Sequence, residues 1–244
     1  MTIWPVGIVV FCFAGLVQGC TGFGMALVAA PCLMLLMPPA RAVCTIVLMS
    51  TLSALFVATQ ARQHIRVRLV GPLALGGVVG MPFGIWTLQA VDPPLLKTLV
   101  GAFVTAFALL LLSGWRRPIA APRWSLIPVG MASGLLGGST SMGGPPVILF
   151  LANQETPKDA FRGNISCYFF TVNCFGIMMF LAKGLIDAQV AFQAAVFLPA
   201  MLLGTYSGVA LAKRVPEALF RKVVMIGVAV MGLVLLATNV RSAV

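Results

Sequence analysis

The residues best suited to bind a ligand lie in one glycine-rich stretch near the middle of the chain, Gly137 to Pro146. Its four glycines allow the backbone to approach a ligand and to turn N–H groups toward it. Ser139, Thr140 and Ser141 add hydroxyl donors. The two prolines that close the stretch can begin a helix whose positive end points back at it. N–H groups, hydroxyls and a helix N-terminus together form a binding site for a small oxyanion.

A shorter copy of this stretch lies near the N-terminus, from Gly19 to Gly24, and Pro31 follows it. Neither copy contains an acidic residue, which argues against a cation as the ligand. Glycines can also serve only to permit close packing, but two copies at matching places in the chain favour a function. The predicted substrate-binding residues are Gly19, Cys20, Thr21, Gly22, Phe23, Gly24, Gly138, Ser139, Thr140, Ser141, Met142, Gly143 and Gly144.

Other polar residues inside apolar segments are weaker candidates. One segment carries several, which either line the path of the ligand or form hydrogen bonds between helices. They are Asn164, Ser166, Tyr168, Thr171 and Asn173.

Catalysis and metal binding have little support in the sequence. The only histidine, His64, lies in a basic loop, so no base is placed beside a serine nucleophile. The six cysteines lie in apolar segments and form no CxxC pair, which does not support a metal site or a disulfide framework. We predict a protein that is not an enzyme, with no catalytic residue, no metal site and no cofactor.

The composition places the chain in a membrane. Of its 244 residues 60% are hydrophobic and 9% are charged, whereas about a quarter of the residues of soluble domains are charged. The formal net charge of +11 comes from Lys and Arg in short loops between apolar segments. That distribution follows the positive-inside rule and does not indicate a nucleic-acid partner. We predict an all-α, multi-pass membrane protein.

Eight apolar segments follow one another along the chain, and two of them contain the glycine-rich stretches. A broken backbone inside a membrane is tolerated only where protein or a water-filled cavity surrounds it. The segments are residues 6–37, 43–59, 69–88, 95–115, 127–152, 163–182, 190–212 and 223–237.

The two halves of the chain repeat the same pattern. The equivalent pairs are Gly15 and Gly134, Gly19 and Gly138, Thr21 and Thr140, and Gly24 and Gly143 at a shift of 119 residues, and Gly80 and Gly204 with Gly84 and Gly208 at a shift of 124. Gly76, Gly80 and Gly84 also form a stripe of small residues suited to close helix contact. We predict an internal duplication of a four-segment element: a first repeat at residues 1–117, a linker at 118–127 and a second repeat at 128–244.

The distribution of the basic residues favours broken segments that are re-entrant, which means that each enters the membrane and returns to the same side. If all eight segments cross the membrane, the Lys and Arg residues divide equally between its two sides. If each broken segment returns to its own side, twelve lie on one side and four on the other, and the side with twelve is cytoplasmic. This count places Lys158 and Arg162 in a polar loop. Both termini then face out and the second repeat is inverted relative to the first. A bent full crossing stays open as the alternative.

Two motifs carry a resemblance to a known family. They are GLVQGCTGFG at residues 15–24, followed by Pro31, and GLLGGSTSMGGPP at residues 134–146. With them, and with His64-Ile65 before the third segment, the chain resembles the sulfite exporter TauE/SafE family over nearly its whole length. The resemblance implies a bacterial inner-membrane protein that moves small sulfur-containing anions such as sulfite, sulfoacetate or thiosulfate, usually outward.

We therefore predict a secondary transporter, acting as an exporter of a small sulfur-containing oxyanion, with alternating access around the two glycine-rich stretches. Its predicted partners are the anionic substrate and the lipid bilayer of the cell inner membrane, and a homodimer is left open. One alternative is an anion channel whose glycine-rich stretches form a selectivity filter. Another is a membrane scaffold that transports nothing.

Overall fold

The structure is a computed structural model that describes residues 3–112, 125–152, 157–212 and 214. All the regular structure in these ranges is helical, which confirms the all-α prediction. The helices are α1 (Ile3–Thr21), α2 (Met25–Leu36), α3 (Pro39–Gln60), the 3₁₀ turn η1 (Arg62–His64), α4 (Val67–Ala90), α5 (Pro93–Leu112), α6 (Leu126–Thr140), α7 (Gly144–Ala152), α8 (Lys158–Ala182) and α9 (Ala188–Ala212). Most of the predicted linker at 118–127 and the last predicted segment, 223–237, lie outside the described residues.

Five helices in the described ranges are long and apolar enough to cross a membrane, namely α1, α3, α4, α8 and α9. Helices α2 and α6 are apolar but shorter, with 12 and 15 residues. At a rise of about 1.5 Å per residue, they are shorter than a hydrocarbon core of about 30 Å. The multi-pass membrane class is therefore confirmed by helix length and composition.

Both glycine-rich stretches interrupt helices. We call residues 22–24, between α1 and α2, the first break, and residues 141–143, between α6 and α7, the second break. Left-handed backbone ends the helix at equivalent positions: φ is 84° at Gly22 and 62° at Ser141. Gly24 also has a positive φ of 103°. Two prolines lie in the first turn of α7, where they remove no helical hydrogen bond.

Two pairs of parallel helices pack closely because glycines face carbonyl groups across each contact. In the pair of α4 and α6, a Cβ added at Gly76 or at Gly80 would lie 2.1 Å from a carbonyl oxygen of α6. In the pair of α1 and α9, a Cβ at Gly204 would lie 1.9 Å from the Cys12 carbonyl oxygen. The glycine stripe predicted on the third segment is thus confirmed as a helix-packing surface.

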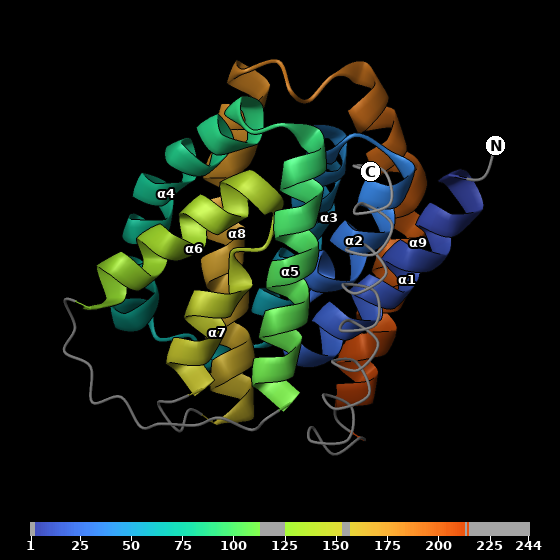
Figure 1. The fold of residues 1–244 in the computed structure, drawn as a ribbon. Helices are drawn as coiled ribbons and strands as arrows, with labels where there is room; N and C mark the ends of the chain where they lie inside the picture. The colour runs from blue at the N-terminus through green and yellow to red at the C-terminus, as the bar shows by residue number, and fades with distance from the viewer. Residues whose placement is uncertain (1–2, 113–124, 153–156, 213, 215–244) are drawn as a thin grey trace.

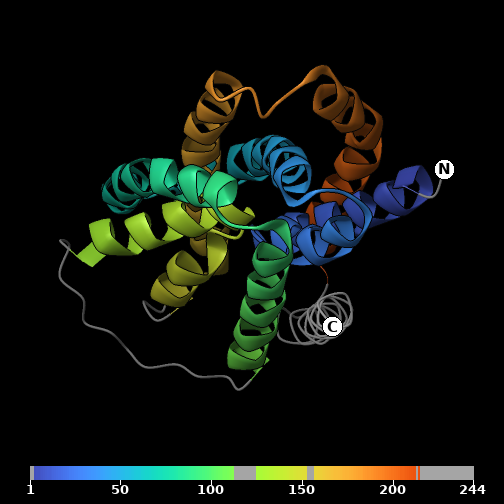
Figure 2. The same ribbon diagram turned by 45° about the horizontal axis from the view of Figure 1, so that its top comes forward.

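The two pairs lie on opposite flanks of the molecule, with α3 and α8 between them (Figure 1, Figure 2). Helices α3 and α8 run antiparallel. Gly163, near the start of α8, packs against the Ala61 carbonyl just after the end of α3. Ten residues further along α8, the Asn173 side chain reaches Ser50 in the middle of α3. These central helices bring side chains to the space between the two breaks.

Candidate functional site

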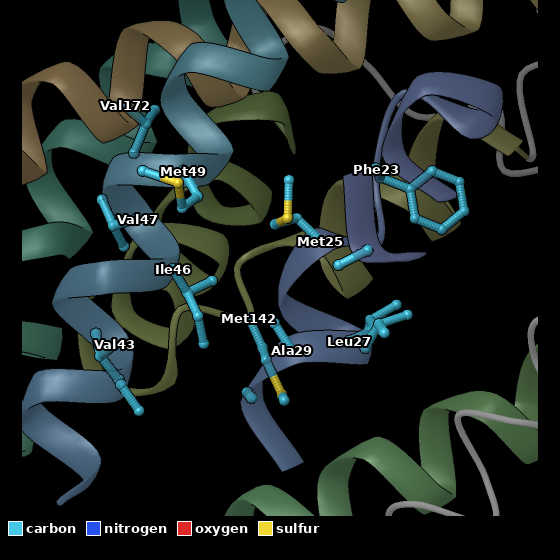
Figure 3. Packing of buried hydrophobic residues seen from close by; sticks show 14 of the residues in the cluster. Phe23, Met25, Leu27, Ala29, Val43, Ile46, Val47, Met49, Met142 and Val172 are labelled. Atoms are coloured by element: carbon cyan, nitrogen blue, oxygen red, sulfur yellow. The ribbon is translucent and has the colours of Figure 1, made fainter. Parts of the chain in front are cut away.

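The two breaks meet at one cavity in the middle of the molecule. The cavity is partly open to solvent. In Figure 3, Met25 at the start of α2 and Met142 of the second break lie on the side that faces Ile46 and Val47 of α3. The cavity is lined by Gln18, Phe23, Gly24, Met25, Ala26, Leu27, Ile46, Val47, Ser50, Met81, Ser133, Gly137, Ser141, Met142, Gly143, Gly144, Pro145, Ile148, Tyr168, Phe169, Val172 and Asn173.

A threonine holds the turn of each break in the same way. At the first break, the Phe23 N–H donates to Thr21 Oγ1 at 3.2 Å, and at the second the Met142 N–H donates to Thr140 Oγ1 at 3.3 Å. Thr140 donates its hydroxyl to the Leu136 carbonyl one turn back at 2.7 Å. Thr21 has two carbonyls within reach, that of Val17 one turn back at 2.9 Å and that of Phe23 at 2.6 Å. Both hydroxyls therefore form hydrogen bonds inside the protein. They lie at the C-terminal ends of α1 and α6 and hold the backbone of Phe23 and Met142 in place.

Neutral polar side chains reach the cavity from four helices. The Gln18 amide on α1 donates to the Ser50 carbonyl of α3 at 3.2 Å, and the Asn173 amide on α8 donates to the Ser50 hydroxyl at 3.5 Å. Tyr168 on α8 donates its hydroxyl to Ser133 of α6 at 2.7 Å. None of the described residues that line the cavity is charged. Within the described residues there is also no cluster of His, Cys, Asp or Glu that could hold a metal ion.

Two helix N-termini also reach the cavity. Helix α2 begins at Met25 and α7 begins at Gly144, and both residues line the cavity. The first N–H groups of a helix have no partner inside it, and its N-terminus carries about half a positive elementary charge. In the first turn of α7 only Gly144 supplies such an N–H, because the two prolines that follow have none. The arrangement offers neutral hydrogen-bond donors and partial positive charge at one place, which is the chemistry that binds a small oxyanion.

A comparison with protein families matches residues 7–235 to the sulfite exporter TauE/SafE family. The chain belongs to this family. No curated protein and no solved structure matches the chain. Membership of a family of membrane transporters agrees with the long apolar helices.

The structure divides the predicted site residues of this TauE/SafE chain into two groups. Six of the thirteen line the cavity: Phe23, Gly24, Ser141, Met142, Gly143 and Gly144. The other seven lie outside its lining: Gly19, Cys20, Thr21, Gly22, Gly138, Ser139 and Thr140.

The residues of the second group have contacts with other helices or within their own. Gly19 packs against α9 and Gly138 against α4, each close to a backbone carbonyl. Cys20 Sγ donates to the Gly208 carbonyl of α9 at 2.9 Å. Ser139 donates to the Leu135 carbonyl one turn back in α6 at 2.9 Å. These contacts hold the two breaks in position. Of the predicted residues, those that line the cavity lie in the breaks themselves or at the start of α7.

Three polar residues of the cavity were absent from the sequence prediction: Gln18, Ser50 and Ser133. Each is a single polar residue in an apolar helix, and polar groups inside a membrane segment usually face the protein interior. That signal could have found them. Tyr168 and Asn173, which were weaker candidates, do line the cavity, whereas the exposed Thr171 bonds within its own helix.

Proposed function

We propose that the protein is a secondary transporter that exports a small sulfur-containing oxyanion, such as sulfite, sulfoacetate or thiosulfate, across the bacterial inner membrane. The observation that carries the proposal is the cavity at which both breaks meet. A transporter needs a site reached by elements that can move relative to each other, and this cavity is lined by both halves of the chain. Family membership gives the class of substrate.

The cavity supports anion binding through donors that need no charged side chain. The hydroxyls of Ser141 and Tyr168 are already used, since they donate to the Thr140 carbonyl and to Ser133 Oγ. The Ser50 hydroxyl and the amides of Gln18 and Asn173 also border the cavity and can donate to a ligand. Two helix N-termini add partial positive charge from opposite halves of the chain. The oxygens of a sulfur oxyanion would accept hydrogen bonds from these groups while the methionine and phenylalanine side chains exclude water.

An inverted duplication, with repeats at residues 1–117 and 128–244, has support in the glycine contacts. A Cβ at Gly15 would meet the Met201 carbonyl oxygen, and a Cβ at Gly134 would meet the Gly77 carbonyl oxygen. Gly15 and Gly134 are 119 residues apart, and Gly77 and Met201 are 124 residues apart. These are the two shifts that align the halves of the sequence. The same contact is therefore made twice, with the roles of the halves exchanged.

The direction of the central helices supports re-entrant broken segments. If every segment crossed the membrane, α3 and α8 would be the second and sixth crossings and would run the same way. Their antiparallel packing agrees instead with an odd number of crossings per half. The chain also descends along α1 and rises along α2, whereas it rises along α6 and descends along α7 (Figure 1). In this arrangement the two breaks enter from opposite faces of the membrane, as in other transporters with inverted repeats.

Binding can be tested by thermal unfolding of the purified protein with sulfite, sulfoacetate, thiosulfate and the carboxylates of matching shape. A ligand that binds the folded state raises the unfolding temperature. We expect a sulfur anion to stabilise the protein more than its carboxylate counterpart. No stabilisation by any of the three sulfur anions would contradict the proposed substrate class.

Transport can be tested in proteoliposomes loaded with the anion that stabilises most. A carrier with alternating access exchanges labelled for unlabelled substrate, so substrate on the opposite side should stimulate the flux. Flux that substrate on the opposite side does not stimulate would indicate an anion channel. Absence of flux despite binding would contradict a transport function.

A further inference from the structure

Helix α8 holds the backbone of the first break. The Arg162 guanidinium is buried, and one of its N–H groups donates to the Gly19 carbonyl in the last turn of α1 at 2.6 Å. The Ser166 hydroxyl, one turn further along α8, donates to the Gly22 carbonyl at 3.2 Å. Carbonyls at the C-terminal end of a helix have no partner inside it, so Arg162 satisfies a carbonyl that α1 exposes. Ser166 satisfies a carbonyl of the break itself.

The same helix holds the second break through an intermediate residue. The Tyr168 hydroxyl donates to Ser133 Oγ at 2.7 Å, and the Ser133 hydroxyl donates to the Gly143 carbonyl. Tyr168 and Ser133 are each 1% exposed. This buried chain of two hydrogen bonds joins α8 to the backbone of the break through α6.

These two hydrogen bonds fix the direction of one peptide group at the cavity. In a planar trans peptide the C=O and the N–H point in opposite directions. Because the Gly143 carbonyl is turned toward Ser133 on α6, the Gly144 N–H of the same peptide points away from α6. Gly144 lines the cavity and is the first residue of α7, so its N–H has no partner inside that helix. If the peptide turned over, a carbonyl oxygen would replace this donor and would repel an oxyanion.

We propose that Tyr168 is a positioning residue of the anion site, which acts through Ser133 to hold the Gly143 carbonyl away from the substrate and to direct the Gly144 N–H at it. This inference rests on the proposed function. Tyr168 does not need to touch the substrate for this role, although it lines the cavity. The role differs from plain core packing, because removal of the hydroxyl alone should weaken anion binding while the ring still fills its place.

The test compares Tyr168→Phe, Ser133→Ala and the double variant with Tyr206→Phe. Tyr206 is the other tyrosine of the chain and is 67% exposed, so it is a matched control. The probe is the anion, among sulfite, sulfoacetate and thiosulfate, that most stabilises the wild-type protein. Loss of a neutral hydrogen bond should weaken its affinity by about two- to tenfold in each single variant. Because Tyr168 acts through Ser133, the double variant should bind the anion as tightly as Ser133→Ala, within about twofold.

Hydrogen exchange provides a second measurement that does not use a ligand. In the anion-free protein, amide exchange at the second break should be faster in Tyr168→Phe and Ser133→Ala than in the wild type and in Tyr206→Phe. If Ser133→Ala does not fold, Tyr168→Phe decides the question, because phenylalanine keeps nearly all the volume of the side chain.

The outcomes separate the inference from the function on which it rests. A wild-type protein that none of the three anions stabilises contradicts the proposed function. A wild-type protein that binds, with Tyr168→Phe and Ser133→Ala binding as tightly as Tyr206→Phe, contradicts the positioning role alone. Losses of anion affinity that add fully in the double variant would also contradict the inference, because they would mean that the two hydroxyls act independently.

Discussion

Replacement of Gly143 by alanine tests most directly whether the second break binds the anion. A Cβ at this position would lie 2.7 Å from the Ser133 carbonyl oxygen and 3.1 Å from Ser133 Oγ. Ordinary contacts of a Cβ begin near 3.4 Å, so the break must move away from α6 by several tenths of an ångström. Gly143 is not among the glycines with a positive φ, so alanine itself is not strained there.

The expected cost falls on affinity. Movement of the break misaligns the Gly144 N–H at the start of α7 and weakens the hydrogen bond between Ser133 and the Gly143 carbonyl. Loss of one hydrogen bond to a charged ligand costs about 1.5–3 kcal/mol, which corresponds to about ten- to hundredfold weaker binding. The assay is a titration of the purified Gly143→Ala protein with the best anion, together with its folded yield, which we expect to stay near that of the wild type.

Gly80→Ala is the control, because its Cβ would lie 2.1 Å from the Met131 carbonyl oxygen and would force α4 and α6 apart. Its cost should appear in the unfolding temperature and not in anion affinity. Gly24→Ala, at the equivalent position in the first break, differs from Gly143→Ala. It combines a φ of 103° with a contact of 2.7 Å to the Val17 side chain, so it should lose stability as well as affinity. If Gly143→Ala binds like the wild type while Gly80→Ala loses affinity, the ligand lies at the helix contact and not at the break.

Three further predictions concern topology, packing and the hydroxyl cluster. Cysteines at Ile3 and Ser242, in a background without reactive cysteines, should be labelled from outside intact cells, and labelling only after permeabilisation would contradict the re-entrant arrangement. Gly204→Ala should lower the unfolding temperature because its Cβ would lie 1.9 Å from a carbonyl oxygen of α1, whereas Gly71→Ala, with no atom within 4 Å, should leave it unchanged or raise it. Ser139→Ala should keep transport within about twofold, because its hydroxyl bonds inside α6, and loss of transport would bring Ser139 into the site.

The sequence predicted the positions of the breaks because they depend on local backbone chemistry. Glycines and prolines inside an apolar segment cannot continue a helix, and both helices end within these stretches. The glycine stripe of the third segment was also predictable, since spacing by four residues puts Gly76, Gly80 and Gly84 on one helix face. Nothing local indicated that this stripe contacts α6, which belongs to the other half of the chain.

The polar residues of the cavity depend on tertiary structure and were only partly predictable. Gln18 and Ser50 are far apart in the sequence, and their meeting depends on how α1 crosses α3. Arg162 was counted with a polar loop, but α8 begins at Lys158 and turns the Arg162 guanidinium inward onto the end of α1. A sequence shows that a helix end needs partners, but it does not show which distant residue supplies them.

The glycine contacts that pair α1 with α9 and α4 with α6 have a consequence for how the protein is made. Each contact joins a helix of the first half to a helix of the second, so neither half can complete its packing alone. When the ribosome has released only the first half into the membrane, the glycine faces of α1 and α4 have no protein partner and lie against lipid or against each other. The two halves should therefore assemble as an interlocked pair after synthesis of α9. A chain cut between α5 and α6 should be functional only when both pieces are made in the same cell.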